Sequence, residues 1–139
     1  MKRKSIHLIF TVFSVLILSS GIISCTMFPT NYLSGTLNKS GADGKTAYVK
    51  LVVKGGEYTA AAIYYTTAVF SGGSTPFSIS YVKADTYTVW VFIDINDNAV
   101  GDGTSVPDAG DYVISSGRDI NMESDQTVNV YEGDWVLLE

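Results

Sequence analysis

The 139-residue sequence has few of the side chains that most enzymes and nucleic-acid-binding proteins use. It contains one cysteine, Cys25, one histidine, His7, and 9 basic residues against 14 acidic ones. His7 and three of the basic residues lie within positions 1–24, so the remaining chain has no histidine, 6 basic and 14 acidic residues, and a net charge of −8. Histidine-dependent triads, zinc sites and general bases are therefore excluded there. Such an acidic chain is also poorly suited to nucleic acid, and we expect no nucleic-acid partner.

The first 24 residues have the pattern of an export signal. Basic residues at positions 2–4 precede an apolar run from Ile6 to Leu18, which is the anatomy of a secretory signal peptide. A membrane-spanning helix over Ile6–Ile23 is the alternative, because this stretch approaches the roughly 20 residues needed to cross a bilayer. The small residues at positions 19–21 weaken such a helix where a cleavage region belongs, which favours the signal peptide.

The residues Ile22-Ile23-Ser24-Cys25 resemble the lipobox of bacterial lipoproteins. The resemblance implies cleavage after Ser24 and a diacylglycerol on the sulfur of Cys25, which becomes the acylated N-terminus. Acylation would also remove the only thiolate from nucleophilic or redox chemistry. We therefore expect a signal peptide over 1–24, a lipidated cysteine and short tether over 25–31, and a folded domain over 32–139.

The expected location is the bacterial cell envelope, with the membrane as a partner through the lipid on Cys25. Thr26 follows the cysteine, and the absence of aspartate there resembles lipoproteins sorted to an outer membrane, on its periplasmic face or at the cell surface.

After Cys25 the hydrophobic pattern has the period of two that is typical of strands. It recurs in Thr46–Val53, Phe77–Tyr81 and Tyr87–Ile95, and again near Val128 and Val136. Tyr87–Ile95 is apolar on both faces, which predicts a central, covered strand. Tyr58–Phe70 mixes an alanine run with β-formers, and we expect one long strand there. With turn residues 10–20 positions apart, the pattern predicts an all-β fold, an antiparallel β-sandwich of seven to eight strands.

Five of the ten aspartates lie between positions 94 and 111, where there is no lysine or arginine. Calcium binds 6–8 oxygen ligands, and oxygen-bearing side chains at alternate positions can supply them. The pattern predicts a calcium site, although Ala99 and Ser105 break the EF-hand spacing. Its candidate ligands are Asp94, Asn96, Asn98, Asp102, Asp108 and Asp111. The alternative is that these residues form turns by bonding to their own backbone.

The strand Thr86–Asn98 and the segment Asp108–Asp111 resemble the corresponding parts of transthyretin-like and Cna-B or SdrD-type β-sandwich modules. This resemblance implies a β-sandwich carried by surface or envelope proteins, some of which bind calcium in this loop. The sequence departs from that pattern at Asp85, where glycine is usual, and at Gly101–Pro107, which lengthen the loop.

Two other functions remain open at this stage. Exposed aromatic side chains on a sandwich could bind a carbohydrate or a peptide, and the candidates are Tyr48, Tyr64, Tyr65, Trp90 and Trp135. A small hydrolase could pair Asp94 with Asp111 or Glu123, although a chain of this length leaves little room for a deep cleft. We expect a non-catalytic binding or structural module, with a possible protein or carbohydrate partner. The sequence carries no signal for an oligomeric state.

Overall fold

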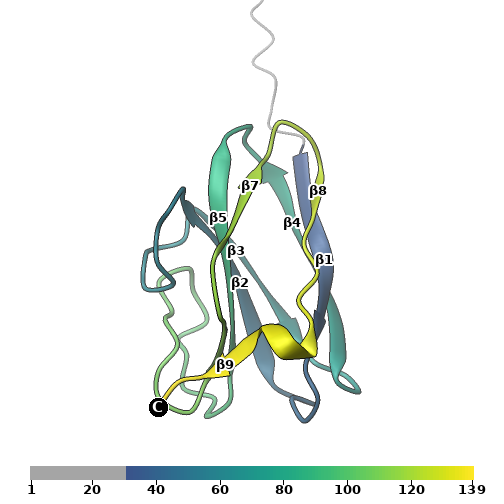
Figure 1. Cartoon of the computed structure of the whole chain (residues 1–139), viewed down its shortest axis with the longest axis vertical. Helices are drawn as coiled ribbons and strands as arrows, with labels where there is room; N and C mark the ends of the chain where they lie inside the picture. Colours follow the sequence, from purple (N-terminus) through teal and green to yellow (C-terminus); the bar gives the residue numbers. More distant parts are fainter. Residues whose placement is uncertain (1–30) are drawn as a thin grey trace, which may run out of the picture.

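The computed structural model describes residues 31–139, which form two packed β-sheets (Figure 1). The predicted signal peptide, the lipobox-like residues and Cys25 lie outside the described residues. Strands pair in the order β4-β1-β8 in the smaller sheet and β3-β2-β5-β6-β9 in the larger one, where β7 also pairs with β5. The strands are β1 (Asn31–Asn38), β2 (Thr46–Val53), β3 (Tyr64–Val69), β4 (Ser74–Val82), β5 (Thr86–Asp94), β6 (Tyr112–Ile114), β7 (Arg118–Asn121), β8 (Gln126–Thr127) and β9 (Trp135–Leu137).

The predicted β-sandwich is confirmed, and residues 31–139 contain nine strands where seven or eight are expected. A single 3₁₀ turn, η1 (Glu132–Asp134), precedes β9. Among the strands of residues 31–139, all pairings are antiparallel except that of β1 with β8, and an isolated parallel bridge joins Leu37 to Val130. Within the described part of the chain, no helix is long and apolar enough to cross a membrane.

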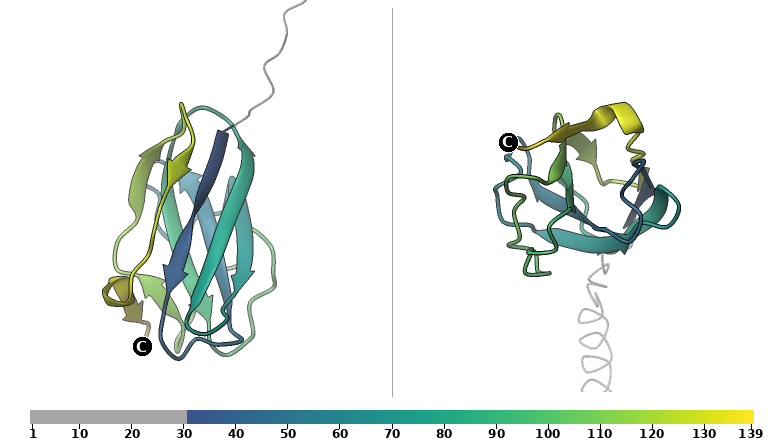
Figure 2. Two further views of the ribbon diagram at one scale, coloured as in Figure 1. Left: turned by 90° about the vertical axis from the view of Figure 1, so that its right-hand side faces the viewer. Right: turned by 90° about the horizontal axis from the view of Figure 1, so that it is seen from below.

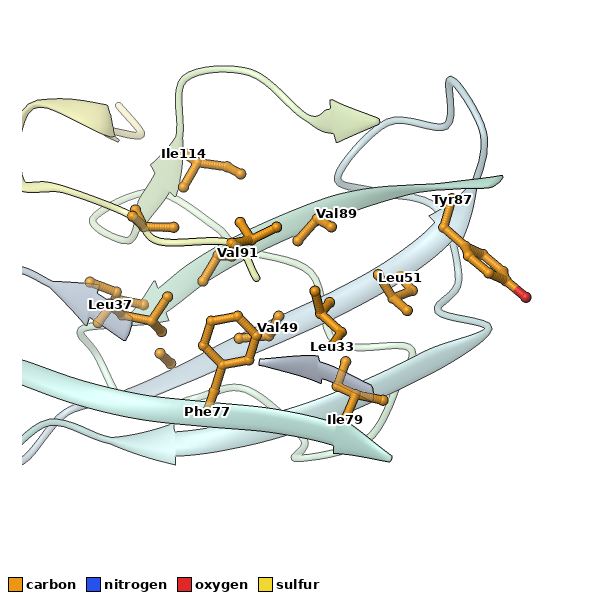
Figure 3. Close-up of a cluster of buried hydrophobic side chains, with 14 of the residues drawn as sticks. Leu33, Leu37, Val49, Leu51, Phe77, Ile79, Tyr87, Val89, Val91 and Ile114 are labelled. Atoms are coloured by element: carbon orange, nitrogen blue, oxygen red, sulfur yellow. The ribbon is translucent and has the colours of Figure 1, made fainter. Parts of the chain in front are cut away.

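The main core lies between the two sheets and is built from alternate residues of their strands (Figure 3). Leu33 and Leu37 of β1 face Val49 of β2 and Val91 of β5, and all four are fully buried. Burying an aliphatic side chain of this size is worth about 1.5–3 kcal/mol. The prediction that Tyr87–Ile95 contains a central strand is confirmed, because β5 pairs with β2 along one edge and with β6 and β7 along the other.

A second, smaller apolar cluster explains why β5 is apolar on both faces. On the outer face of the larger sheet, the Tyr48 and Phe92 rings stack with centroids 4.6 Å apart, next to Val113. Tyr58 and Ala99, from two long loops, pack against this cluster. Loops therefore bury the outer face of the larger sheet.

The predicted long strand over Tyr58–Phe70 is wrong in its first half, since β3 begins only at Tyr64. Residues 58–63 form a turn-rich segment that lies against the loop between β5 and β6, where the Ala62 amide donates to the Gly103 carbonyl at 3.0 Å. Tyr58 sits edge-on to Trp90, with ring centroids 5.7 Å apart. Contact with a distant loop thus overrides the strand propensity of this segment.

The predicted alternation of Phe77, Ile79 and Tyr81 fails at its last residue, because Tyr81 is exposed and Val82 is buried in its place. The register between β1 and β4 shifts by one residue at this point. Tyr81 has a left-handed backbone, with φ of 60°. A β-bulge of this kind inserts one residue into a strand and reverses the facing of those that follow.

The two ends of the sandwich are chemically different (Figures 1 and 2). β1 begins at Asn31 at one end, which also holds the end of β4 and the β7–β8 turn. The segment between β5 and β6, which contains the acidic residues, lies at the other end with the C-terminus. β4 spans nine residues, so the ends are about 30 Å apart.

Candidate functional site

The acidic loop, residues 95–111, joins β5 to β6 and is the candidate site. Two aspartates at its borders are buried, Asp94 being 3% and Asp111 1% exposed. Asp94 accepts hydrogen bonds from the backbone N–H groups of Asn98 (3.1 Å) and Ala99 (3.0 Å). Asp111 accepts them from Ile95 (2.9 Å) and Asp108 (3.1 Å). Both buried carboxylates therefore fold the loop by satisfying backbone donors that the sheet leaves free.

Three exposed side chains converge above this buried pair. The amide nitrogen of Asn96 donates to Asp108 Oδ1 at 2.8 Å, and that of Asn98 donates to Asp108 Oδ2 at 2.7 Å. These two hydrogen bonds lower the pKa of Asp108 because they favour its charged form. Five of the six predicted ligands thus form one connected cluster: Asp94, Asn96, Asn98, Asp108 and Asp111.

The sixth predicted ligand, Asp102, lies apart from this cluster. Its carboxylate accepts hydrogen bonds from the hydroxyl (2.6 Å) and the backbone N–H (2.8 Å) of Thr104. The same contacts lower the pKa of Asp102. In the described chain no hydrogen bond joins Asp102 to the other five residues, so it has the role of a local turn former.

A basic side chain from outside the loop partly neutralises it. Lys45 Nζ lies 2.7 Å from Asp97 Oδ2, and Asp97 has a left-handed backbone with φ of 59°. Lys45 belongs to the turn between β1 and β2, far away in sequence. The charge repulsion within the loop is therefore smaller than the lack of lysine and arginine between positions 94 and 111 suggests.

Sequence reasoning missed a second basic residue, Lys50, which fastens the loop to the sheet. Lys50 is 1% exposed, and its ammonium donates to the carbonyls of Ser105 (2.8 Å) and Tyr58 (3.2 Å). Burial lowers the pKa of Lys50 because it disfavours the ammonium form. A lone lysine within the apolar strand Thr46–Val53 was the available signal. Lys50 thus holds together the two loops that cover the outer face of the larger sheet.

The chemistry of the cluster is compatible with a hard cation, although the described residues contain no group of three or more His, Cys, Asp or Glu placed to hold a metal. The ligands of such a cation would include the side-chain oxygens of Asn96 and Asn98, and asparagine is not among those four residue types. Each carboxylate oxygen of Asp108 accepts one hydrogen bond and can accept a second partner. The oxygen-only donor set suits calcium better than zinc or copper.

The predicted aromatic candidates do not form an exposed platform. Tyr48 and Trp135 are buried, and the Trp135 indole donates to the Asn38 carbonyl at 2.8 Å. Trp90 is half-buried and donates to the Gly56 carbonyl at 2.7 Å. Tyr64 packs edge-on against Tyr87, with centroids 5.8 Å apart. Of the five, Tyr65 alone is exposed.

The candidate carboxylate pairs are likewise not arranged around a cleft. Asp94 and Asp111 are both buried and bonded to backbone N–H groups. Glu123 lies in the β7–β8 turn, at the opposite end of the sandwich. Neither pair has the geometry of two carboxylates that face a substrate.

A scan against protein-family models finds no match for this sequence, and a search of curated proteins finds no significant relative. The functional argument therefore rests on the residues and their geometry.

Proposed function

We propose that this chain is a lipid-anchored, non-catalytic module of a bacterial cell envelope, which holds its acidic loop away from the membrane. The observation that carries the proposal is that the chain enters the sandwich at the end opposite to its acidic loop. β1 begins at Asn31 at one end, and the acidic loop lies at the other (Figure 1). With acylation at Cys25, β1 begins six positions after the anchor, a reach of at most about 20–22 Å.

The fixed shape of the loop supports a binding or structural role. Asp94 and Asp111 bond to its backbone from within, and Lys50 fastens it to the sheet. Val100 is 81% exposed in this loop, which offers an apolar contact among acidic side chains. A loop held in one conformation loses less entropy when a protein partner binds it.

Substitution of the anchor residue tests the location. We expect Cys25→Ser to move the protein from the membrane fraction to the soluble fraction or to leave the uncleaved precursor, because serine cannot take the thioether-linked lipid. The wild-type protein should have the mass of a diacylated or triacylated chain that starts at Cys25. Thr26→Ser is the matched control and should keep both lipid and location. An unacylated wild-type chain that stays in the membrane with residues 1–24 intact would contradict the proposal and favour a membrane-spanning helix.

A calcium-stabilised loop is the second candidate function. The observation that favours it is that the exposed side chains of Asn96 and Asn98 both donate to Asp108. Two buried aspartates hold the loop that carries these three residues. Rotation of the two amide groups by half a turn would exchange nitrogen for oxygen and direct further oxygens toward a cation. Calcium there would stiffen the loop.

Thermal melting tests the calcium site. We expect millimolar Ca²⁺ to raise the melting temperature relative to EDTA, since a ligand that binds only the folded state stabilises it by about 2.7 kcal/mol at 100 times its Kd. Asn96→Ala should abolish the rise, whereas Asp102→Ala should preserve it, because Asp102 lies outside the cluster. Identical wild-type melting curves in Ca²⁺ and EDTA would reject calcium binding.

A further inference from the structure

The end of the sandwich where β1 begins carries an exposed aromatic pair that none of the functions above uses. Tyr32 of β1 is 43% exposed and Tyr81 of β4 is 64% exposed. Their ring centroids lie 6.2 Å apart at an interplanar angle of 46°. Both residues belong to the end at which the chain enters the domain (Figure 2).

The local backbone places Tyr81 outside at an energetic cost. Leu33 pairs with Ile79 and Asn31 with Val82, so that two residues of β4, Ser80 and Tyr81, lie opposite Tyr32 alone. Tyr81 has a φ of 60°, a left-handed conformation that is unfavourable for an ordinary L-residue. Without this bulge, the alternation of β4 would direct Tyr81 into the core. Strain that exposes an aromatic side chain is a reason to seek a partner for it.

We propose that Tyr32 and Tyr81 insert into the interfacial layer of the bilayer to which Cys25 is anchored, and this inference rests on the proposed lipid anchor. Tyr32 is seven residues from Cys25, within about 23–25 Å even when the chain is fully extended. Tyrosine is enriched at membrane interfaces, because its ring is apolar and its hydroxyl can stay hydrated. The chain thus keeps this pair within reach of the lipid head groups.

The charges of this end favour neutral lipid. Five exposed charged residues lie in the segments that follow β2, join β4 to β5 and join β7 to β8: Lys54, Lys83, Asp85, Glu123 and Asp125. This end is therefore not a polybasic surface that anionic lipids would attract. The tilt between the two rings also differs from the flat surface on which a sugar ring stacks. Contact through aromatic rings should accordingly persist in phosphatidylcholine and at high salt.

The test measures how close each tyrosine position lies to lipid in the acylated full-length protein. Tyr81→Trp and Tyr32→Trp proteins are reconstituted into phosphatidylcholine vesicles whose acyl chains are brominated near the head groups. We expect the emission that each introduced tryptophan adds to that of the native Trp90 and Trp135 to fall by roughly half, as for a residue at the depth of the interface. Tyr131→Trp is the matched control, because Tyr131 is 62% exposed beside η1 at the opposite end, and its emission should not change.

The pattern of quenching over the three positions supports or overturns the membrane contact of Tyr32 and Tyr81. Quenching at positions 32 and 81 but not at 131 supports the inference. Three results with an acylated protein would overturn the inference. They are no quenching at any position, equal quenching at all three positions, and a blue shift that depends on the density of protein in the membrane and not on bromine. The last result would identify a second copy of the chain as the occupant, and the lipid anchor would stand in all three cases. A protein without lipid on Cys25 would overturn the anchor and this inference together. Melting curves show that each variant is folded before it is reconstituted.

Discussion

Gly35→Ala is expected to destabilise the domain by about 3 kcal/mol or more, at the upper end of the cost of overpacking a core. A Cβ at Gly35 would lie 1.8 Å from the carbonyl oxygen of Val128 and 2.8 Å from a ring carbon of Phe77. The clash with Val128 is with backbone, which a side-chain rotation cannot relieve. Relief requires the β8 segment to move and to break the bond from the Val128 N–H to the Ser34 carbonyl, now 2.9 Å. Urea unfolding measures the effect directly.

Gly133→Ala is the matched control for this substitution. No heavy atom lies within 4 Å of a Cβ built at Gly133, and its φ is not in the left-handed region. We expect a change within about 0.5 kcal/mol, as for most surface substitutions. Equal unfolding free energies for the two variants would show that β1 and the β8 segment are not packed so closely.

Asp111→Ala should destabilise the domain by about 3 kcal/mol, because it removes the acceptor for two backbone N–H groups at a cost of roughly 1–3 kcal/mol each. The donors are Ile95 and Asp108, and the aspartate that binds them is 1% exposed. The unfolding free energy of Asp111→Asn should lie between those of the wild type and Asp111→Ala, since an amide keeps one oxygen acceptor. Unfolding is measured in EDTA, so that a loss of calcium binding does not contribute.

The control for Asp111 is its neighbour in the same cluster. Asp108 is exposed and its partners are exposed amide groups, which water can satisfy after Asp108→Ala. The expected loss in EDTA is below about 1 kcal/mol. If Asp108→Ala and Asp111→Ala were equally destabilising in EDTA, the division into buried aspartates that fold the loop and exposed groups available to a ligand would be wrong.

The strands that the sequence predicted correctly are those whose periodicity agrees with their burial. Thr46–Val53 coincides with β2, and Tyr87–Ile95 contains all but the first residue of β5. Each pairs with neighbours over most of its length, so local pattern and tertiary environment favour the same structure. The prediction failed for residues 58–63, where β-formers make contacts with the acidic loop and leave the sheet.

The acidic loop was located correctly, but the roles of its members were not distinguishable in the sequence. Six oxygen-bearing residues were equivalent as candidate ligands. The structure separates them into two buried acceptors of backbone N–H groups, three connected exposed groups, and Asp102, whose carboxylate bonds Thr104 outside that cluster. The side chains that hold and compensate the loop, Lys45 and Lys50, lie some 50 residues away in sequence, where no local pattern reveals them.

By itself, the sequence determined the β-rich class, the excess of acidic side chains and the absence of histidine after residue 24, because composition and a period of two are properties of adjacent residues. Tertiary structure alone decided which end of the sandwich holds the acidic loop, and that Tyr32 and Tyr81 meet at the other. It also decided that Lys50 is buried between two loops and that Gly35 lies against the backbone of Val128. These properties depend on contacts between residues about 50 to 90 positions apart in the chain, whose distances only the packing of the two sheets establishes.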